Sequence, residues 1–598
     1  VAFSEGFMKN ECTIIAPDGD LQKPCNEFVL EQARKYGDKI LISDDAHFTT
    51  SEEKIVQDVK LQQGGGNWRQ AGSYHRRTSE EAFATFQQTL GTDEKTFAGW
   101  VDNGKEWASR FKDFKFQDRK SLPTKFYPDD TLTHLFALIQ RHGRQDCLRK
   151  PEYVARLQQE IDLLHRNGTV DLLPYFFLDE EICELYQSNG LLTGPGRGSA
   201  AGVLLTYLLE ITHVDPLKYG LSLDRFLTLD RIKSGKWPDI DQDLPHRDLL
   251  VNDSGTGWLA QRFGDHQCQI STDTTIKLKS AVLDVHRIRS TNRQIPPEVA
   301  KLAHQFANPP QGIDNRDFVF GYDNNGEPVA GAIEWDPPLM EYAKTYPEEW
   351  GIVCKCLGIS RQKGRHPCAY VVCNEPVRNF IPTMTVGGFT VTQPTAPQVE
   401  SSGGLKMDLL VVNSLNYIQA AIKLIQERSV DKSQPWGKNG QAVMLDGRRV
   451  PLHRVVPRDG KYYDIWDLPE EQPVFRNICE GDTESVFQFG THGAKKWLTQ
   501  FNHIRHVEPN GEAHKALDSI LALATFTALD RPGPLDASPE GATHNMLVEY
   551  ARRAKGETAV GSFPILDKLF PETFGVICFQ EQVQKAFQEV GSTTAIEA

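Results

Sequence analysis

Gly194-Pro-Gly-Arg-Gly-Ser199-Ala-Ala-Gly202 is the stretch around which the chain is organised. The apolar run at 203–209 that follows has helical length, and Ser199 is a suitable N-cap for it. A glycine turn before a helix presents free backbone N–H groups and the positive end of the helix dipole, and Arg197 adds a fixed charge. The stretch therefore predicts a phosphate-binding turn, although such turns are often only tight connections.

A second informative segment, Pro238-Asp239-Ile-Asp241, lies further along the chain and has the pattern of a strand. Successive strand residues point to opposite faces, so Asp239, Asp241 and Asp243 are expected on one face and Ile240 on the other. Two carboxylates on a rigid strand can chelate a hard cation such as Mg²⁺. In a chain with 80 acidic residues, however, such a pair is more often a solvated strand edge.

Two better-known motifs are excluded at these segments. A P-loop ends in Gly-Lys-Ser/Thr, whereas this turn ends in Gly198-Ser199 without a lysine. A calcium loop that began at Asp239 would need glycine at its sixth position and glutamate at its twelfth. The chain has Leu244 and Leu250 there, so neither a P-loop nor an EF-hand is expected.

Further motifs accompany these two segments in a fixed order. Val214-Asp-Pro-Leu-Lys-Tyr-Gly220 and Asp224-Arg-Phe-Leu227 lie between the glycine turn and the aspartate pair. This ordered set resembles the palm of the bacterial replicative DNA polymerase III alpha subunit, the C family of DNA polymerases. Later segments are similar to the fingers of the same family: 481–488, 531–535 and 575–583.

The resemblance implies a fold class and a domain order. The expected fold is a multidomain mixture of α/β and α+β structure: a nucleotidyltransferase-like palm with a mixed sheet, a helical thumb, helical fingers and the remnant of an N-terminal PHP phosphoesterase domain. The implied boundaries are 1–118 for the C-terminal part of the PHP-like domain, 119–270 and 360–413 for two palm segments, 271–359 for the thumb and 414–598 for partial fingers.

A third aspartate stands inside an otherwise apolar strand pattern, Leu405-Lys406-Met-Asp408-Leu-Leu-Val-Val412. Burying a lone carboxylate is costly, so Asp408 needs a metal, a cationic partner or solvent at an edge strand. The resemblance implies that Asp239, Asp241 and Asp408 are catalytic and hold two Mg²⁺ ions. The implied reaction is DNA-templated addition of a deoxynucleotide to a primer 3′-hydroxyl with release of pyrophosphate.

Other positions are expected to bind substrates. Lys406 should share a strand face with Asp408, which places it well for a triphosphate. The candidate nucleotide-binding residues are Arg197, Gly198, Ser199, Arg361, Lys406 and Arg531, and the candidate DNA-binding residues are Lys277, Lys279, Arg287 and His366. The alternatives are a solvated helix face for the basic residues, a capped Pro-Gly turn for Arg531 and a core hydrogen bond for His366.

The N-terminal part contains one more candidate metal site. Asp45 and His47 match an Asp-x-His pair that ligates metal in the PHP domain, with Zn²⁺ or Mn²⁺ as the implied ion. A lone Asp-x-His is usually a surface turn. A zinc site is also conceivable at Cys354, Cys356, His366, Cys368 and Cys373, but the group lacks Cys-x-x-Cys and buried free cysteines are commoner.

Composition limits the possible partners. The net charge of −14 argues against a protein that coats nucleic acid through a global positive field, so DNA contacts must be local. The sequence has no membrane-spanning apolar run and no secretion signal, and its 11 cysteines suit a reducing cytoplasm. The expected partners are primer-template DNA, deoxynucleoside triphosphates, and a sliding clamp and other replisome subunits that bind through segments outside this chain.

Several positions depart from the family pattern. Val411 and Asn413 stand where a glycine and a basic residue are usual, and Phe579 stands where a tyrosine is common. These changes indicate a divergent branch, with a virus as a candidate source, and the missing family segments indicate a truncated member. Two other functions stay open: a catalytically silent scaffold that binds primer-template, and a PHP-type phosphoesterase or exonuclease that depends on Asp45 and His47.

Overall fold

The computed structural model describes residues 11–15, 22–61, 74–114, 120–235, 238–252, 255–310, 313–323, 326–429, 441–484, 486, 488–501, 505–507, 513–515, 517–539, 541–557 and 563–591. The chain divides into two compact units. Unit 1 consists of Val1–Asp118 and Ser271–Arg365, and unit 2 of Arg119–Ile270 and His366–Ala598. Each unit is therefore built from two separate stretches of sequence.

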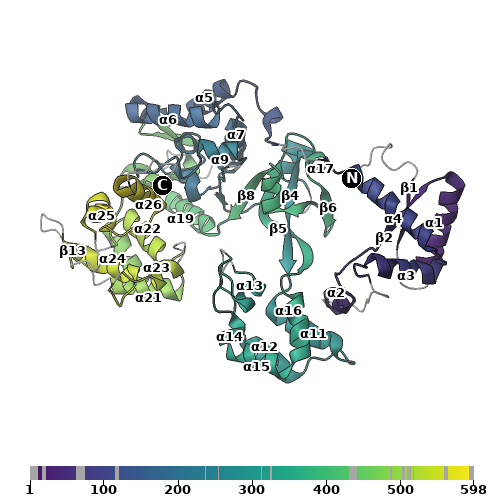
Figure 1. The fold of residues 1–598 in the computed structure, drawn as a ribbon. Coiled ribbons are helices and arrows are strands. Elements are labelled where there is room, and N and C mark those ends of the chain that lie inside the picture. Colours follow the sequence, from purple (N-terminus) through teal and green to yellow (C-terminus); the bar gives the residue numbers. More distant parts are fainter. Residues whose placement is uncertain are drawn as a thin grey trace. The chain divides into compact units, whose positions relative to one another are not determined.

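Unit 1 begins with a small α/β region and continues, after residue 271, with helices (Figure 1). Its elements are β1 (Glu11–Ile15), α1 (Gln22–Tyr36), β2 (Lys39–Ser43), α2 (Lys54–Leu61), α3 (Ser79–Leu90), α4 (Glu94–Ser109), α11 (Leu278–Arg289), α12 (Pro297–Gln305), α13 (Asn315–Phe320), α14 (Ala332–Trp335), α15 (Pro337–Thr345) and α16 (Pro347–Cys356).

Unit 2 contains the remaining helices and most of the strands. Its first stretch has α5 (Thr131–His142), α6 (Pro151–Leu164), α7 (Leu173–Ser188), α8 (Leu204–Leu208), α9 (Leu229–Lys233), β3 (Gln242–Leu244) and α10 (Trp258–Phe263). Its second stretch has α17 (Val377–Phe380), β6 (Thr383–Val386), β7 (Phe389–Thr395), α18 (Ala396–Ser401), β8 (Leu405–Val411), α19 (Ser414–Arg428), β9 (Ala442–Leu445), β10 (Arg448–Pro451), β11 (Val455–Arg458), β12 (Lys461–Asp464), α20 (Gln472–Cys479), α21 (His492–Phe501), β13 (Arg505–Val507), β14 (Ala513–Lys515), α22 (Ile520–Leu529), α23 (Pro532–Asp536), α24 (Met546–Ala554), α25 (Pro564–Leu569) and α26 (Gln580–Gly591). Two strands, β4 (Gln267–Thr275) and β5 (Ser360–Val372), run across the boundaries between the units.

Unit 1 holds its two stretches together through apolar packing. Val56 and Val59 on α2 are buried in the same cluster as Val285 of α11 and Val353 of α16. These residues recur on one face of each helix, which is the pattern of an amphipathic helix that packs on a shared core. A separate cluster, which includes Phe86 and Trp100, joins α3 and α4 to the strand β2.

A mixed six-stranded sheet dominates unit 2. Its strand order is β3-β8-β5-β4-β7-β6, and strands β8, β5, β4 and β6 are labelled in Figure 1. β3 pairs with β8 in parallel, whereas β5 pairs with β8, and β6 with β7, in antiparallel register. The fold is thus a mixed α/β arrangement in which β8 lies between a parallel and an antiparallel neighbour.

The helix α7 lies at the centre of the core of unit 2. Leu173, Tyr175, Phe176, Phe177 and Ile182 are all fully buried, and the same cluster includes residues of α5, α6, α8, β3 and β8. Residues 173–180 of α7 are all buried, so this half of the helix is covered on every side. α7 therefore fixes the positions of the elements around it.

Several elements agree with the local sequence pattern. Apolar periodicity predicts a strand at 39–43, an amphipathic helix at 153–164 and a long helix from Ser414, and these are present as β2, α6 and α19. Two boundaries differ. The pattern predicts a helix from Glu180, whereas α7 begins already at Leu173, and the strand expected from Pro238 begins only at Gln242.

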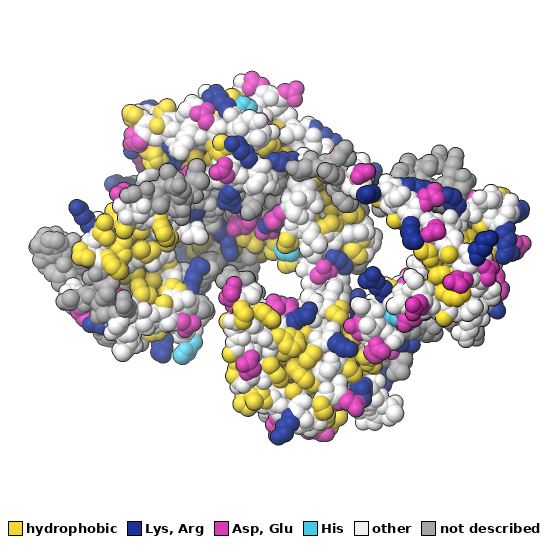
Figure 2. Space-filling view, in the orientation of Figure 1, with side chains coloured by type: hydrophobic (Ala, Val, Ile, Leu, Met, Phe, Trp, Pro, Cys, Tyr) yellow, Lys and Arg dark blue, Asp and Glu magenta, His cyan; other side chains and the backbone are white. Residues whose placement is uncertain are grey.

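The C-terminal helices expose apolar side chains. In Figure 2 such side chains gather over the region of α22 to α25 on the visible face. Ile520, Leu521 and Ile565 of this region are exposed. On the same view, lysine and arginine are interspersed with aspartate and glutamate, as expected for a chain with a net charge of −14. None of the described helices is long and apolar enough to cross a bilayer.

A buried ion network joins the segment after α5, the segment after α8 and the β11–β12 hairpin. Arg454 is 1% exposed, and its guanidinium donates to Glu210 at 2.6 Å and to both oxygens of Asp464. Arg144 also pairs with Glu210. Burial alone raises the pKa of Glu210, but the two guanidinium groups outweigh it and hold that pKa well below its ordinary value. Arg454 is thus the cation that the buried carboxylates of Glu210 and Asp464 share.

We expect Arg454→Met to destabilise unit 2 by about 3 kcal/mol or more, because it leaves two buried carboxylates without their shared cation. Urea denaturation followed by tryptophan fluorescence measures this. Arg458→Met is the matched control, since Arg458 pairs with Glu471 at the exposed surface. Equal midpoints for the two variants would contradict the assignment of a structural role to the buried network.

Candidate active site

Three aspartates predicted from separate segments lie together in unit 2. β3 and β8 pair in parallel, with Gln242 opposite Leu409. Asp241 immediately precedes β3 and Asp408 immediately precedes Leu409, so this register places the two side by side. Each of Asp239, Asp241 and Asp408 offers a carboxylate oxygen within 4.8 Å of the others.

The alternation expected for 239–244 is present although the regular strand is short. Ile240, Gln242 and Leu244 are buried, whereas Asp239 is exposed and Asp241 is half-buried. Asp243 lies apart from the three and accepts a hydrogen bond from Arg197 at 3.3 Å. The segment therefore presents two carboxylates to the cluster and uses the third to bind the glycine turn.

Lys406 lies among the carboxylates. Its ammonium is 2.7 Å from Asp408, 3.5 Å from Asp239 and 3.6 Å from Glu400. Burial alone lowers the pKa of Lys406, but the hydrogen bond to Asp408 and the charges of the acidic groups raise it overall. Lys406 is therefore a permanent cation that offsets part of the negative charge, and its predicted position on the face of Asp408 is confirmed.

The remaining negative charge suits a divalent cation. Burial, and then the charges of Asp239 and Asp408, raise the pKa of Asp241 above its ordinary value. The Oδ1 atom of Asp408 is buried and has no hydrogen-bond partner among the described residues. A buried, unpartnered carboxylate oxygen is costly, and oxygen ligands of this kind are those that Mg²⁺ prefers. The residues present therefore fit Mg²⁺.

The glycine turn packs directly against these aspartates. Gly194 donates its N–H to the carbonyl of Asp243 at 2.8 Å, and a Cβ on Gly194 would come within 2.6 Å of the Asp243 side chain. Gly198 has φ +58°, a conformation that glycine adopts without strain. A Cβ there would lie 3.5 Å from Asp241. Glycine at these positions brings the turn into contact with the carboxylates.

The helix expected after the turn differs from the prediction. Ser199 lies in a 3-10 turn, Gly198–Gly202, and is not the N-cap; Val203 occupies that position before α8. The backbone N–H groups of Leu204 and Leu205 both donate to the carboxylate of Glu160 at 2.8 Å. This buried side chain from α6 occupies the start of α8, so those amides are not available to a phosphate.

Comparison with known proteins decides the family. Residues 132–411, which include all three aspartates, match the family model described as bacterial DNA polymerase III alpha NTPase domain. Residues 451–598 match the one described as bacterial DNA polymerase III alpha subunit finger domain, and the two matches cover more than two thirds of the chain. The chain belongs to the bacterial DNA polymerase III alpha subunit family.

Curated members of this family are similar over most of the chain, at low identity. The DNA polymerase III subunit alpha of Aquifex aeolicus is 25% identical across 96% of this chain and 47% of its own length. Those of Vibrio cholerae and Bacillus subtilis are each 28% identical across about three quarters of this chain. The chain spans about half, or less, of the length of the curated relatives it matches.

Two predicted nucleotide-binding arginines stand on other elements than the three aspartates. Arg361 lies in the part of β5 that belongs to unit 1, so its position relative to the aspartates is not defined. Arg531 stands at the N-cap position of α23 with an exposed side chain. Neither residue is joined to Asp239, Asp241 or Asp408 by an ion pair in the part of the chain that the structure describes.

The predicted DNA-binding residues belong to both units. Lys277 and Lys279 lie at the start of α11 in unit 1, and Arg287 on the same helix pairs with Asp284. His366, in unit 2, has its Nδ1 turned back onto its own strand, where it accepts the N–H groups of Cys368 and Ala369 at 3.2 and 2.9 Å. Their assignment to DNA binding stays a prediction.

The predicted N-terminal metal pair is exposed. Nε2 of His47 lies 3.7 Å from a carboxylate oxygen of Asp45, and both side chains are at least 43% exposed. Among the described residues, clusters of three or more potential metal ligands occur only at the aspartates and at His142, Glu180 and Glu184. Asp45–His47 and the cysteines considered for zinc therefore belong to no such cluster in the described chain.

Residues behind the aspartates were not predicted from the sequence. Tyr175 on α7 accepts the N–H of Ile240 at 2.9 Å, and Gln242 donates to Asp179 at 2.8 Å. Burial, and to a lesser degree Asp239, raises the pKa of Asp179 well above its ordinary value. The one sequence feature that could have revealed this support is Asp179, an acidic residue after the apolar run 172–178. These bonds hold the backbone between Asp239 and Asp241.

We expect the aspartate cluster to bind Mn²⁺, a spectroscopic substitute for Mg²⁺, and Asp408→Asn to weaken this binding by about tenfold or more, because it removes a ligand charge. Lys406→Met should instead strengthen binding, since it removes the competing ammonium. Electron paramagnetic resonance of free Mn²⁺ measures both. Asp230→Asn, an exposed aspartate on α9, is the control, and unchanged affinity in Asp408→Asn would contradict the site.

Proposed function

We propose that the protein is a DNA-templated DNA polymerase, which adds a deoxynucleotide to a primer 3′-hydroxyl and releases pyrophosphate. The observation that carries the proposal is the approach of Asp239, Asp241 and Asp408 to within 4.8 Å of one another, beside a glycine turn, in a member of a polymerase family. Phosphoryl transfer needs little covalent chemistry from the protein, so positioning and charge are the main requirements.

The three aspartates would hold two Mg²⁺ ions. When bound, such ions lower the pKa of the attacking hydroxyl and neutralise the transferred and departing phosphate oxygens. The chain's own contribution is to keep the carboxylates converged. Tyr175 fixes the backbone at Ile240, and β8 holds Asp408 in a strand that has neighbours on both sides. The site is thereby preorganised before substrate binds.

Cationic groups around the aspartates would bind the triphosphate. Lys406 is within 3.5 Å of two of the aspartates and can exchange one carboxylate for a phosphate oxygen. Arg197 is 39% exposed and pairs with Asp243, outside the cluster. Gly198 and Ser199 would add backbone N–H groups from the turn. Arg361 and Arg531 are assigned to the triphosphate on family resemblance alone.

The domain names follow from the same proposal. Residues 119–270 and 360–413 would form the palm, 271–359 the thumb, 414–598 part of the fingers, and 1–118 the C-terminal part of a PHP-like domain. Lys277, Lys279 and Arg287 of α11, together with His366, would contact primer-template DNA. These contacts would be made to the backbone, because template pairing supplies sequence information. A sliding clamp and other replisome subunits are the proposed protein partners.

Primer extension by the full-length protein in Mg²⁺ tests the proposal. We expect Asp239→Asn and Asp408→Asn each to lower the extension rate by about 10³-fold, a loss of about 4 kcal/mol of transition-state stabilisation. Asp230→Asn should extend at the wild-type rate. Full activity in Asp408→Asn would refute the assignment of the catalytic residues.

The same assay separates the alternatives. Wild-type protein that binds primer-template without extending it would instead be a replication scaffold. DNA degradation that survives Asp408→Asn and is lost in His47→Ala would identify a phosphoesterase or exonuclease in the N-terminal part. Neither result is expected from the proposed polymerase.

A further inference from the structure

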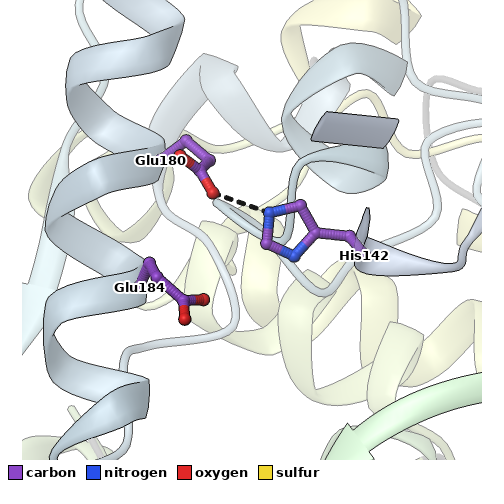
Figure 3. Close-up of side chains that lie close together, drawn as sticks. All are labelled: His142, Glu180 and Glu184. Carbon is purple, nitrogen blue, oxygen red and sulfur yellow. Dashed lines mark hydrogen bonds and ion pairs between the residues drawn. The ribbon is translucent and has the colours of Figure 1, made fainter. Parts of the chain in front are cut away.

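A second cluster of potential metal ligands lies in unit 2 and shares no residue with the aspartates. His142 is the last residue of α5, and Glu180 and Glu184 lie one turn apart on α7. Figure 3 shows both glutamates turned toward the histidine. Nε2 of His142 is 2.7 Å from Glu180, and the three side chains each offer a ligand atom within 4.8 Å of the others.

The cluster combines burial with like charge. The side chains of His142 and Glu180 are 9% and 3% exposed. Two glutamates four residues apart on one helix face repel each other, and a buried carboxylate needs a charged partner. Arg141 supplies one such partner to Glu180. Glu184, unlike the other two, is solvent-accessible, and it has no hydrogen bond or ion pair within the described residues, so its carboxylate is available as a ligand.

A small cavity adjoins Glu184. Its volume is about 60 Å³, and its lining includes His142, Glu184, Gln187 and Ser188 as well as the cations Arg141 and Arg449. This is enough for an ion with one or two water molecules, since a single water needs about 15 Å³ on this measure. The polar lining provides hydrogen-bond partners for such waters. The cluster therefore faces a space of the right size.

We propose that His142, Glu180 and Glu184 form a binding site for a single Zn²⁺ ion. One imidazole nitrogen and two carboxylates are a ligand set that zinc accepts in proteins, with water in the fourth position. Mg²⁺ prefers oxygen ligands alone and would favour the aspartates instead. Arg141 contacts the same Glu180 oxygen as His142 does, and would hold this carboxylate in place, as outer-shell partners commonly do.

The ion would tie α5 to α7. α7 also carries Tyr175, whose hydroxyl holds the backbone of Ile240 between two of the aspartates. The zinc site is therefore structural: it fixes the end of α5 against the helix that supports the candidate active site. This role is independent of the polymerase proposal, because it concerns metal binding and stability alone.

Zinc titration of the full-length protein tests the site. The background is Asp239→Asn/Asp408→Asn, which removes the other ligand cluster, and excess Mg²⁺ is present throughout. A chelator competition assay should find one equivalent of Zn²⁺ whose affinity falls about tenfold or more in His142→Ala and in Glu184→Gln. The matched controls are His304→Ala and Glu152→Gln, both at exposed positions.

Thermal unfolding gives a second readout. Zn²⁺ should raise the melting temperature of the background protein and leave that of His142→Ala unchanged. If His142→Ala does not fold, Glu184→Gln serves alone, because Glu184 has no protein partner to lose. Zinc affinity that is the same in the variants and the background, or the absence of any bound equivalent, would mean that the cluster is only a hydrogen-bonded ion group.

Discussion

The parallel pairing of β3 with β8 is the constraint on which the candidate active site depends. It places Asp241 beside Asp408, although some 170 residues of chain separate them. Three carboxylates held this close repel one another, so the site needs positive charge nearby to offset the repulsion. Lys406, two residues before Asp408 on the same face of β8, supplies one positive charge. The unpartnered oxygen of Asp408 indicates that a further cation completes the balance.

The segment that carries Asp239 and Asp241 is supported by α7, which packs behind it. The N-terminal half of α7 is buried, and it bonds both the backbone of Ile240 and the side chain of Gln242. On the open side, the turn at Gly194 bonds to Asp243. The short segment that carries the aspartates is thus held from two directions. A rigid backbone here matters more than regular strand structure, which begins only at Gln242.

Local sequence patterns predicted the parts of the site that depend on strand periodicity. The outward faces of Asp239 and Asp241, and the shared face of Lys406 and Asp408, follow from alternation. The patterns failed where a distant side chain decides the outcome. Ser199 looked like an N-cap, but Glu160, from a helix earlier in the chain, caps α8. His142 meets Glu180 only because α5 packs on α7. Neither contact can be predicted from the sequence of a single helix or strand. The roles of the site residues rest on the resemblance to the polymerase family.

The carboxylate of Glu160 has a consequence for how the proposed polymerase would hold a phosphate. A helix terminus binds phosphate through fixed amide dipoles, but here a protein side chain already fills that position. Attraction for a triphosphate would then come mainly from side-chain cations and from metal ions. Such charges are screened by dissolved salt more readily than buried dipoles are. Nucleotide binding by the proposed polymerase would therefore respond steeply to ionic strength.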